Sequence, residues 1–118
     1  MAIKRFEDIV AWQKAQDLGV VVYTLFRDSR DFGFRDQICR AAVSVSNNIA
    51  EGFDRRSDAE FIRFLNIARS SCNEVKSMVY LGERLGYLDA SKRGALIAQC
   101  EEISKVILGL ARSLSPRA

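Results

Sequence analysis

The stretch FRDQICRAAVSVSNNIAEG, residues Phe34–Gly52, decides the fold class of this chain. Its apolar residues recur at steps of four, four, three and four, at Phe34, Ile38, Ala42, Val45 and Ile49. Because an α-helix has 3.6 residues per turn, this spacing places the five side chains on one face of a helix. Gly52 is expected to end the helix, since glycine accepts the left-handed conformation at low cost.

The same helical period extends outward from this stretch and fills nearly the whole chain. The predicted helices span about residues 8–27, 34–52, 58–85 and 90–114. Ser57 and Asp89 are expected to cap the third and fourth helices, and Gly86 follows the last turn of the third. Short connections make sequential helices antiparallel neighbours. The sequence therefore predicts an all-α fold, an antiparallel up-down-up-down four-helix bundle, as a single domain over residues 1–118.

Composition is that of an ordinary soluble domain. The chain has 118 residues, 48% of them hydrophobic and 28% charged, and a formal net charge of +3. No run approaches the roughly 20 apolar residues that span a bilayer, so we expect no membrane association. The three cysteines, Cys39, Cys72 and Cys100, match neither a disulfide framework nor a metal motif. They are expected to be buried in a cytoplasmic protein.

Several chemistries are excluded by the residue types. The chain has no histidine, which removes Ser-His-Asp and Cys-His nucleophiles and the Glu-x-x-His pairs of di-iron bundles. Neither phosphate-binding glycine motif is present. Glu51, Glu60 and Glu74 have oxygen ligands that suit Mg²⁺, but nothing in their spacing enforces a site. We expect a non-enzymatic protein with no cofactor, no metal and no small-molecule substrate.

A polar ribbon runs along the helix of the opening stretch, beside its apolar face. Its members are Arg40, Ser44, Asn47, Asn48 and Glu51. The first interpretation is a hydrogen-bond network that fixes packing within the bundle or between subunits. The second is a pocket or nucleic-acid contact at Asn48 and Glu51, and the third is solvent exposure without a role.

Four arginines are candidate nucleic-acid contacts. Arg55 and Arg56 lie together in the turn FDRRSD, and Arg63 and Arg69 follow in the third helix. In a ring of subunits, such a pair would be repeated into a strongly basic ring. The two aspartates of the same turn partly offset this charge and favour a solvated turn.

The run QICRAAVSVSNNIAEGFDRRSDAEFIRFLNIARSSCNE, residues 37–74, carries a resemblance to a known family. It resembles the four-helix-bundle proteins encoded in the intervening sequences of bacterial 23S rRNA genes, the S23 ribosomal protein family. The matching residues are Gln37, Arg40, Ala41, Ala42, Ser44, Asn48, Ile49, Ala50, Glu51, Gly52, Glu60, Phe61, Phe64, Leu65, Ile67 and Ala68. The opening FEDIVAWQKAQDL and the segment LGYL at residues 85–88 are similar to the family too. At Ser46 the family usually has proline.

The resemblance implies a homo-oligomer of four-helix subunits, since known members resemble rings of five. It implies no established activity, and the rRNA connection is one of gene location. Two functions therefore remain open. One is a homo-oligomeric protein that contacts RNA or a ribonucleoprotein, and the other is a structural or protein-interaction module with no nucleic-acid role.

Overall fold

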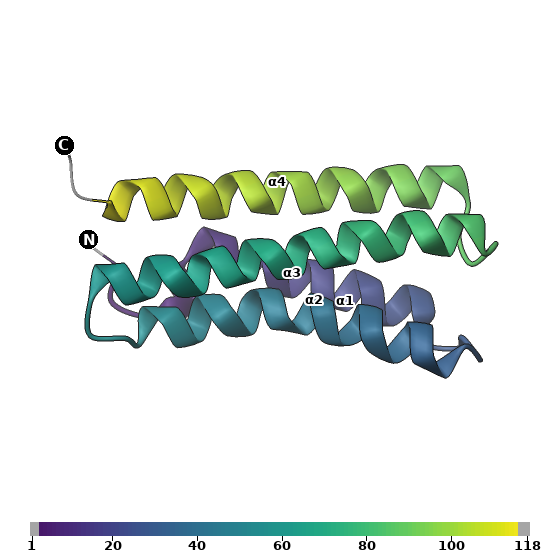
Figure 1. Cartoon of the computed structure of the whole chain (residues 1–118), viewed down its shortest axis with the longest axis horizontal. Helices are drawn as coiled ribbons and strands as arrows, with labels where there is room; N and C mark the ends of the chain where they lie inside the picture. Colours follow the sequence, from purple (N-terminus) through teal and green to yellow (C-terminus); the bar gives the residue numbers. More distant parts are fainter. Residues whose placement is uncertain (1–2, 116–118) are drawn as a thin grey trace.

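The computed structural model describes residues 3–115, which form four long helices and no strand. The elements are a short 3₁₀ helix η1 (Phe6–Asp8), α1 (Val10–Phe26), α2 (Phe32–Phe53), α3 (Asp58–Arg84) and α4 (Ala90–Leu114). The helices lie side by side, and successive connections fall at opposite ends of the molecule (Figure 1). The predicted all-α, up-down-up-down bundle is therefore confirmed. The one proline of the chain, Pro116, comes two residues after the predicted end of the fourth helix and lies outside the described residues.

The core consists of one buried stripe from each helix. All five apolar residues that defined the opening stretch are buried. The expected burial of the three cysteines is also confirmed. Phe26 completes the buried stripe of α1 at its C-terminal end, whereas Leu85 is 49% exposed. Leu85 follows the last residue of α3, at the end of the bundle, and so lies beyond the stripe that this helix buries.

Side-chain caps set three of the helix starts. The Ser57 Oγ accepts a hydrogen bond from the Glu60 N–H at 3.2 Å, and the Asp89 Oδ1 accepts one from the Lys92 N–H at 2.8 Å, as predicted. Asp31 caps α2 in the same way, accepting from the Phe34 N–H at 3.1 Å. Because of this cap, α2 begins two residues before its predicted start.

Gly52 does not end α2 through a left-handed conformation, so that prediction was wrong. The helix continues to Phe53, and Gly86 is the glycine with positive φ among the described residues, at 81°. A Cβ built at Gly52 would lie 2.6 Å from the Phe64 Cβ and 2.9 Å from the Phe61 Cδ1. Gly52 therefore serves the close approach of α2 and α3.

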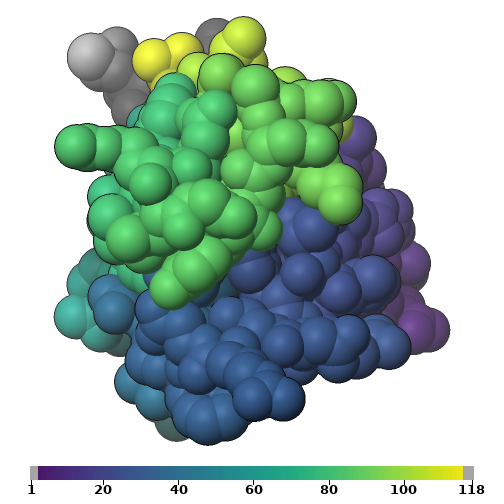
Figure 2. Space-filling view, turned by 90° about the vertical axis from the view of Figure 1, so that its right-hand side faces the viewer, coloured from purple at the N-terminus to yellow at the C-terminus, as the bar shows by residue number. Residues whose placement is uncertain are grey.

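The α1–α2 and α3–α4 connections lie against each other at one end of the bundle, as Figure 2 shows. The Tyr87 hydroxyl donates to the Asp31 Oδ2 at 2.6 Å. The Phe34 ring packs edge-on between Phe26 and Tyr87, with centroids 5.3 and 5.1 Å away. The Tyr87–Asp31 hydrogen bond and the Phe34–Tyr87 ring contact thus join the N-terminal cap of α2 to the α3–α4 connection.

Candidate nucleic-acid interface

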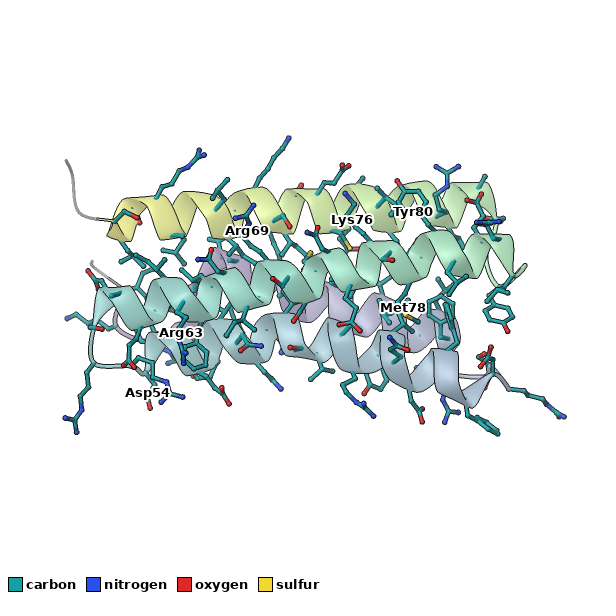
Figure 3. All side chains as sticks on the ribbon, viewed as in Figure 1. Asp54, Arg63, Arg69, Lys76, Met78 and Tyr80 are labelled. Carbon is teal, nitrogen blue, oxygen red and sulfur yellow. The ribbon has the colours of Figure 1, made fainter. Side chains whose placement is uncertain are left out.

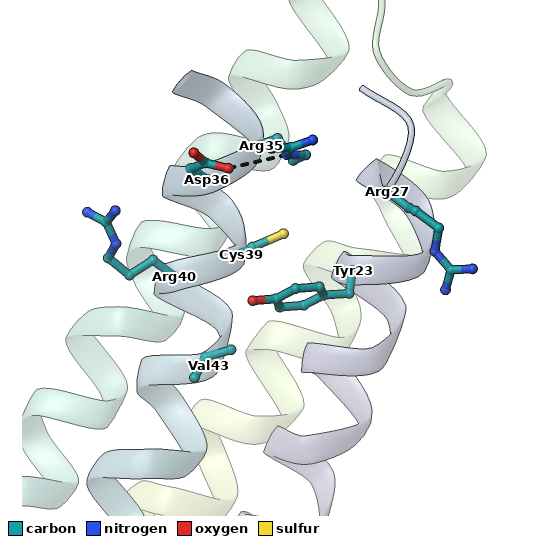
Figure 4. A pocket seen from close by; sticks show the side chains of 7 residues that line it. All are labelled: Tyr23, Arg27, Arg35, Asp36, Cys39, Arg40 and Val43. Carbon is teal, nitrogen blue, oxygen red and sulfur yellow. Dashed lines mark hydrogen bonds and ion pairs between the residues drawn. The ribbon is translucent and has the colours of Figure 1, made fainter. Parts of the chain in front are cut away.

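A groove of about 570 Å³ lies between the C-terminal part of α1 and the N-terminal part of α2. We call it the α1–α2 groove; its lining residues are Tyr23, Arg27, Arg35, Asp36, Cys39, Arg40 and Val43. Figure 4 shows Tyr23 reaching from α1 toward Cys39 and Val43 of α2. Arg27 of the α1 end and Arg40 of α2 line its two sides, which we call its rims, and Figure 4 shows their guanidinium groups extending away from Tyr23 in opposite directions.

The groove carries more positive than negative charge. Its one carboxylate, Asp36, pairs with the neighbouring Arg35 at 3.2 Å. The Arg35 guanidinium also stacks over the Phe32 ring, 4.8 Å from its centroid. Among the described residues, Arg27 and Arg40 take part in no ion pair. These two guanidinium groups therefore keep their donors available to an anion.

The floor of the groove is apolar and aromatic. Tyr23 is 51% exposed, so about half of this residue is accessible to a ligand. Cys39 is buried, and burial raises the pKa of its thiol. At neutral pH this cysteine is therefore a small neutral side chain, and the charge of the groove comes from its rims.

Sequence reasoning missed Arg27 and Arg35 and placed Arg40 in the polar ribbon. Tyr23 and Arg27 are one turn apart on α1, which was a detectable signal for a shared face. Nothing in the sequence indicated that this face borders Arg40 of α2. That proximity comes from the packing of α1 against α2.

Three of the four predicted arginines lie together at the α2–α3 end of the bundle. We call Arg55, Arg56 and Arg63 the arginine corner; it lies around the α2–α3 connection and the first turns of α3. The Arg55 and Arg63 guanidinium carbons lie 4.6 and 5.5 Å from the centroid of the Phe64 ring. Both cations therefore lie within the range of cation–π attraction to this ring.

Arg69, the fourth predicted arginine, does not join the corner. Figure 3 shows Arg69 and Lys76 between α3 and α4, whereas Arg63 lies on the side of α3 that faces α2. Arg63 and Arg69 are six residues apart, so they project from different sides of the helix. The predicted arginines thus divide between two surfaces.

Two members of the polar ribbon take part in a hydrogen-bond network between α2 and α3. The Asn48 Nδ2 donates to the Ser44 carbonyl at 2.8 Å and to the Ser44 Oγ at 2.9 Å. The Ser44 Oγ lies 2.9 Å from the Ser71 Oγ. Ser71 was missed because its own helix pattern gave no sign of a polar partner.

The other three members point outward. Arg40, Asn47 and Glu51 are exposed, and within residues 3–115 their side chains make no hydrogen bond to protein. Ser46, where the family usually has proline, is buried and accepts a hydrogen bond from the Gln16 Nε2 at 3.0 Å. The Ser46 Oγ also donates to the Val43 carbonyl at 3.3 Å. The serine thus links α2 to α1.

Metal ligands and membrane spans also bear on function. Within residues 3–115, no group of three or more His, Cys, Asp or Glu residues is placed to hold a metal ion. In the same part of the chain, no helix has both the length and the apolar character needed to cross a bilayer.

The family model of the 23S rRNA-intervening sequence protein matches residues 7–109. This chain belongs to that family. The matched range includes the α1–α2 groove, the arginine corner and the Ser44–Ser71 network. The resemblance found in the sequence is therefore confirmed.

A solved structure supports the same membership. It is the crystal structure of a protein with unknown function from the S23 ribosomal protein family of Bacteroides thetaiotaomicron. Its TM-score to this 23S rRNA-intervening sequence family member is 0.81 at 26% sequence identity, over 87% of this chain and 99% of that chain. No curated protein matches this chain.

Proposed function

We propose that this chain is a non-enzymatic, homo-oligomeric bundle protein that contacts RNA through the α1–α2 groove. The observation that carries the proposal is a half-exposed tyrosine on the floor of a groove with arginines on both rims. Proteins that bind single-stranded nucleic acid combine these two features, because cations meet the phosphates while aromatic rings stack on bases. The rRNA connection in the family description supports RNA as the ligand.

The residues of the groove would have different roles in binding RNA. Arg27 and Arg40 would bind phosphates on either side of the groove through charge-assisted hydrogen bonds. The half-exposed Tyr23 would stack its ring on a base, a contact that tolerates any sequence. Arg35, held by Asp36 and Phe32, would mainly shape the wall.

The arginine corner would extend this interface. It lies about 20 Å from Arg40 along α2, at 1.5 Å per helical residue. Arg55 and Arg56 would add phosphate contacts there without base recognition. Their contribution would therefore depend strongly on salt and little on RNA sequence.

Oligomerisation would multiply these contacts. Exposed apolar side chains on the last turns of α3, at Tyr80 and Leu81, and at Leu85 directly after the helix support a subunit interface. The ring of five subunits implied by family resemblance would present five grooves to one RNA, so weak individual contacts would add up. A cytoplasmic location is part of this proposal.

RNA binding measured at several salt concentrations tests the groove. The logarithm of the binding constant is expected to fall linearly with the logarithm of salt, and Arg27→Gln with Arg40→Gln should lower that slope by about 0.7–0.9 for each phosphate that the variant no longer binds. Tyr23→Ala should cost about 1–3 kcal/mol of binding free energy and leave the slope unchanged. The different effects separate phosphate contacts from stacking.

A matched control changes two exposed arginines elsewhere, Arg84→Gln with Arg112→Gln, and removes the same charge. This control variant should retain most of the wild-type salt slope. The salt slope of Arg55→Ala with Arg56→Ala should lie between those of the control variant and the groove variant. A wild-type protein that binds no RNA even near about 50 mM salt would contradict the proposal. The structural or protein-interaction role would then be the better account, and the exposed apolar residues of α3 would be its first candidate surface.

A further inference from the structure

A second basic pocket lies on a different pair of helices, between α3 and α4. We call it the α3–α4 pocket; its volume is about 280 Å³. The residues that line it are Arg69, Asn73, Lys76, Glu101, Ser104 and Lys105. The first three are four and three residues apart on α3, which places them on one side of that helix.

Positive charge exceeds negative charge in this pocket. Three of its residues are cationic and one, Glu101, is a carboxylate. The Lys76 Nζ lies 3.5 Å from the Glu101 Oε2, longer than the roughly 2.7–2.9 Å typical of charge-assisted hydrogen bonds. The Glu101 side chain is 56% exposed and that of Lys76 only 27%. The carboxylate is therefore better solvated than the cation that it faces.

Arg69 supplies an independent observation. Its Nε is buried, and within the described part of the chain it has no hydrogen-bond partner. A buried N–H without an acceptor is unfavourable because the group has lost water and gained nothing in return. A ligand oxygen entering between the two helices would provide the missing acceptor.

We propose that the α3–α4 pocket binds a phosphoryl group, with Arg69 as its principal ligand. A guanidinium matches a phosphoryl group through two parallel N–H donors, one of them Nε–H. Lys105 and Lys76 add charge, and the Asn73 amide and Ser104 hydroxyl are neutral donors from the two helices. Donors on both sides of the pocket suit a tetrahedral anion with several oxygens better than a planar carboxylate with two.

The phosphoryl group has two sources: inorganic phosphate, or a phosphate ester such as a nucleotide or an RNA backbone. The α3–α4 pocket shares no residue with the α1–α2 groove or the arginine corner. The inference therefore does not depend on the groove, and RNA is not needed to test it.

The test observes the Arg69 side chain directly. The ¹H–¹⁵N resonance of its Nε–H is followed by NMR during titration with inorganic phosphate, and a parallel titration with sodium chloride reaches the same ionic strength. We expect phosphate to shift this resonance saturably and to slow its exchange with water, whereas chloride produces a small, linear shift. Equal, linear shifts in both salts would overturn the proposal.

Variants connect the shift to the pocket. Arg69→Met removes the buried donor, so its melting temperature without phosphate should equal or exceed that of the wild type. Phosphate should raise the melting temperature of the wild type but not of Arg69→Met, since only a ligand-binding native state is stabilised. Arg112→Met, an exposed arginine of α4 outside the pocket, is the matched control and should keep the full response. A phosphate response that survives in Arg69→Met would contradict the assignment.

Lys105→Gln provides a second variant that should fold normally, because Lys105 is exposed. We expect about a tenfold weaker phosphate affinity, and an unchanged affinity would remove Lys105 from the site. Adenosine monophosphate and a short RNA then distinguish the two sources. If either shifts the Arg69 resonance at a lower concentration than phosphate does, the ligand is an ester; if neither does, it is the free anion.

Discussion

The α2–α3 and α1–α2 contacts differ although both contain a glycine and a polar hydrogen bond. Where α2 meets α3, a Cβ at Gly52 would lie 2.6 Å from the Phe64 Cβ. Where α1 meets α2, a Cβ at Gly19 would have nothing within 4 Å among the described residues. Gly52 therefore lies in a close helix contact with no room for a Cβ, whereas Gly19 lies where a Cβ would fit freely.

The polar bonds of the two contacts differ in the same way. Ser44 and Ser71 are short side chains that meet at 2.9 Å, whereas Ser46 is reached from α1 by the longer side chain of Gln16. Longer side chains bridge helices that lie farther apart. At these residues α3 approaches α2 more closely than α1 does.

The largest expected effect is that of Gly52→Ala. Its new methyl group would meet the Phe64 Cβ, which cannot move unless α3 moves with it. Overpacking of this kind costs about 3 kcal/mol, and the better helix propensity of alanine returns about 1 kcal/mol. We expect a net loss of about 2 kcal/mol in the free energy of unfolding, measured by urea denaturation.

Gly19→Ala is the matched control on the looser contact. Because the new methyl group has open space around it, the gain in helix propensity should stabilise the protein by about 0.5–1 kcal/mol. The comparison of the two contacts fails if both glycine variants change stability in the same direction.

A smaller effect is expected from Asn48→Leu, which removes the hydrogen bonds from Asn48 to Ser44. The free energy of unfolding should fall by about 1 kcal/mol with unchanged oligomer size, since the bonds lie within one chain. The neighbouring Asn47 is exposed, so Asn47→Leu should change the free energy of unfolding by less than about 0.5 kcal/mol. Light scattering checks the assembly: a change of oligomer size in Asn48→Leu would place the residue at a subunit interface instead.

The smallest effect concerns pH at the end of the bundle. Hydrogen bonds from the Tyr87 hydroxyl and the Phe34 N–H lower the pKa of Asp31 below its ordinary value of 3.8. The unfolded chain therefore binds a proton at Asp31 more tightly than the folded chain does. The stability that the ionised Asp31 contributes is present above pH 3.8 and is lost as pH falls through the lowered pKa. Tyr87→Phe should therefore lose less stability than the wild type on acidification across this window. Urea denaturation at a series of pH values checks this, and identical pH profiles would show that the Tyr87–Asp31 bond has no such role.

Much of the fold was predictable because each helix carries its own periodic signal. The apolar residues of Phe34–Gly52 marked the buried face of α2, and Ser57 and Asp89 marked the starts of α3 and α4. The candidate sites were less predictable. Arg55 and Arg56 are adjacent in sequence and were found, whereas the rims of the groove come from two helices and were not.

The sequence by itself determined which segments are helical, which face of each helix is buried and to which family the chain belongs. These properties depend on short-range spacing and on local motifs, which one helix expresses without its neighbours. Only the tertiary structure decided that Gly52 serves a close contact and that Tyr23 shares a groove with Arg40. These are relations between helices, set by how far apart their side chains hold them, and no pattern within one helix encodes that distance.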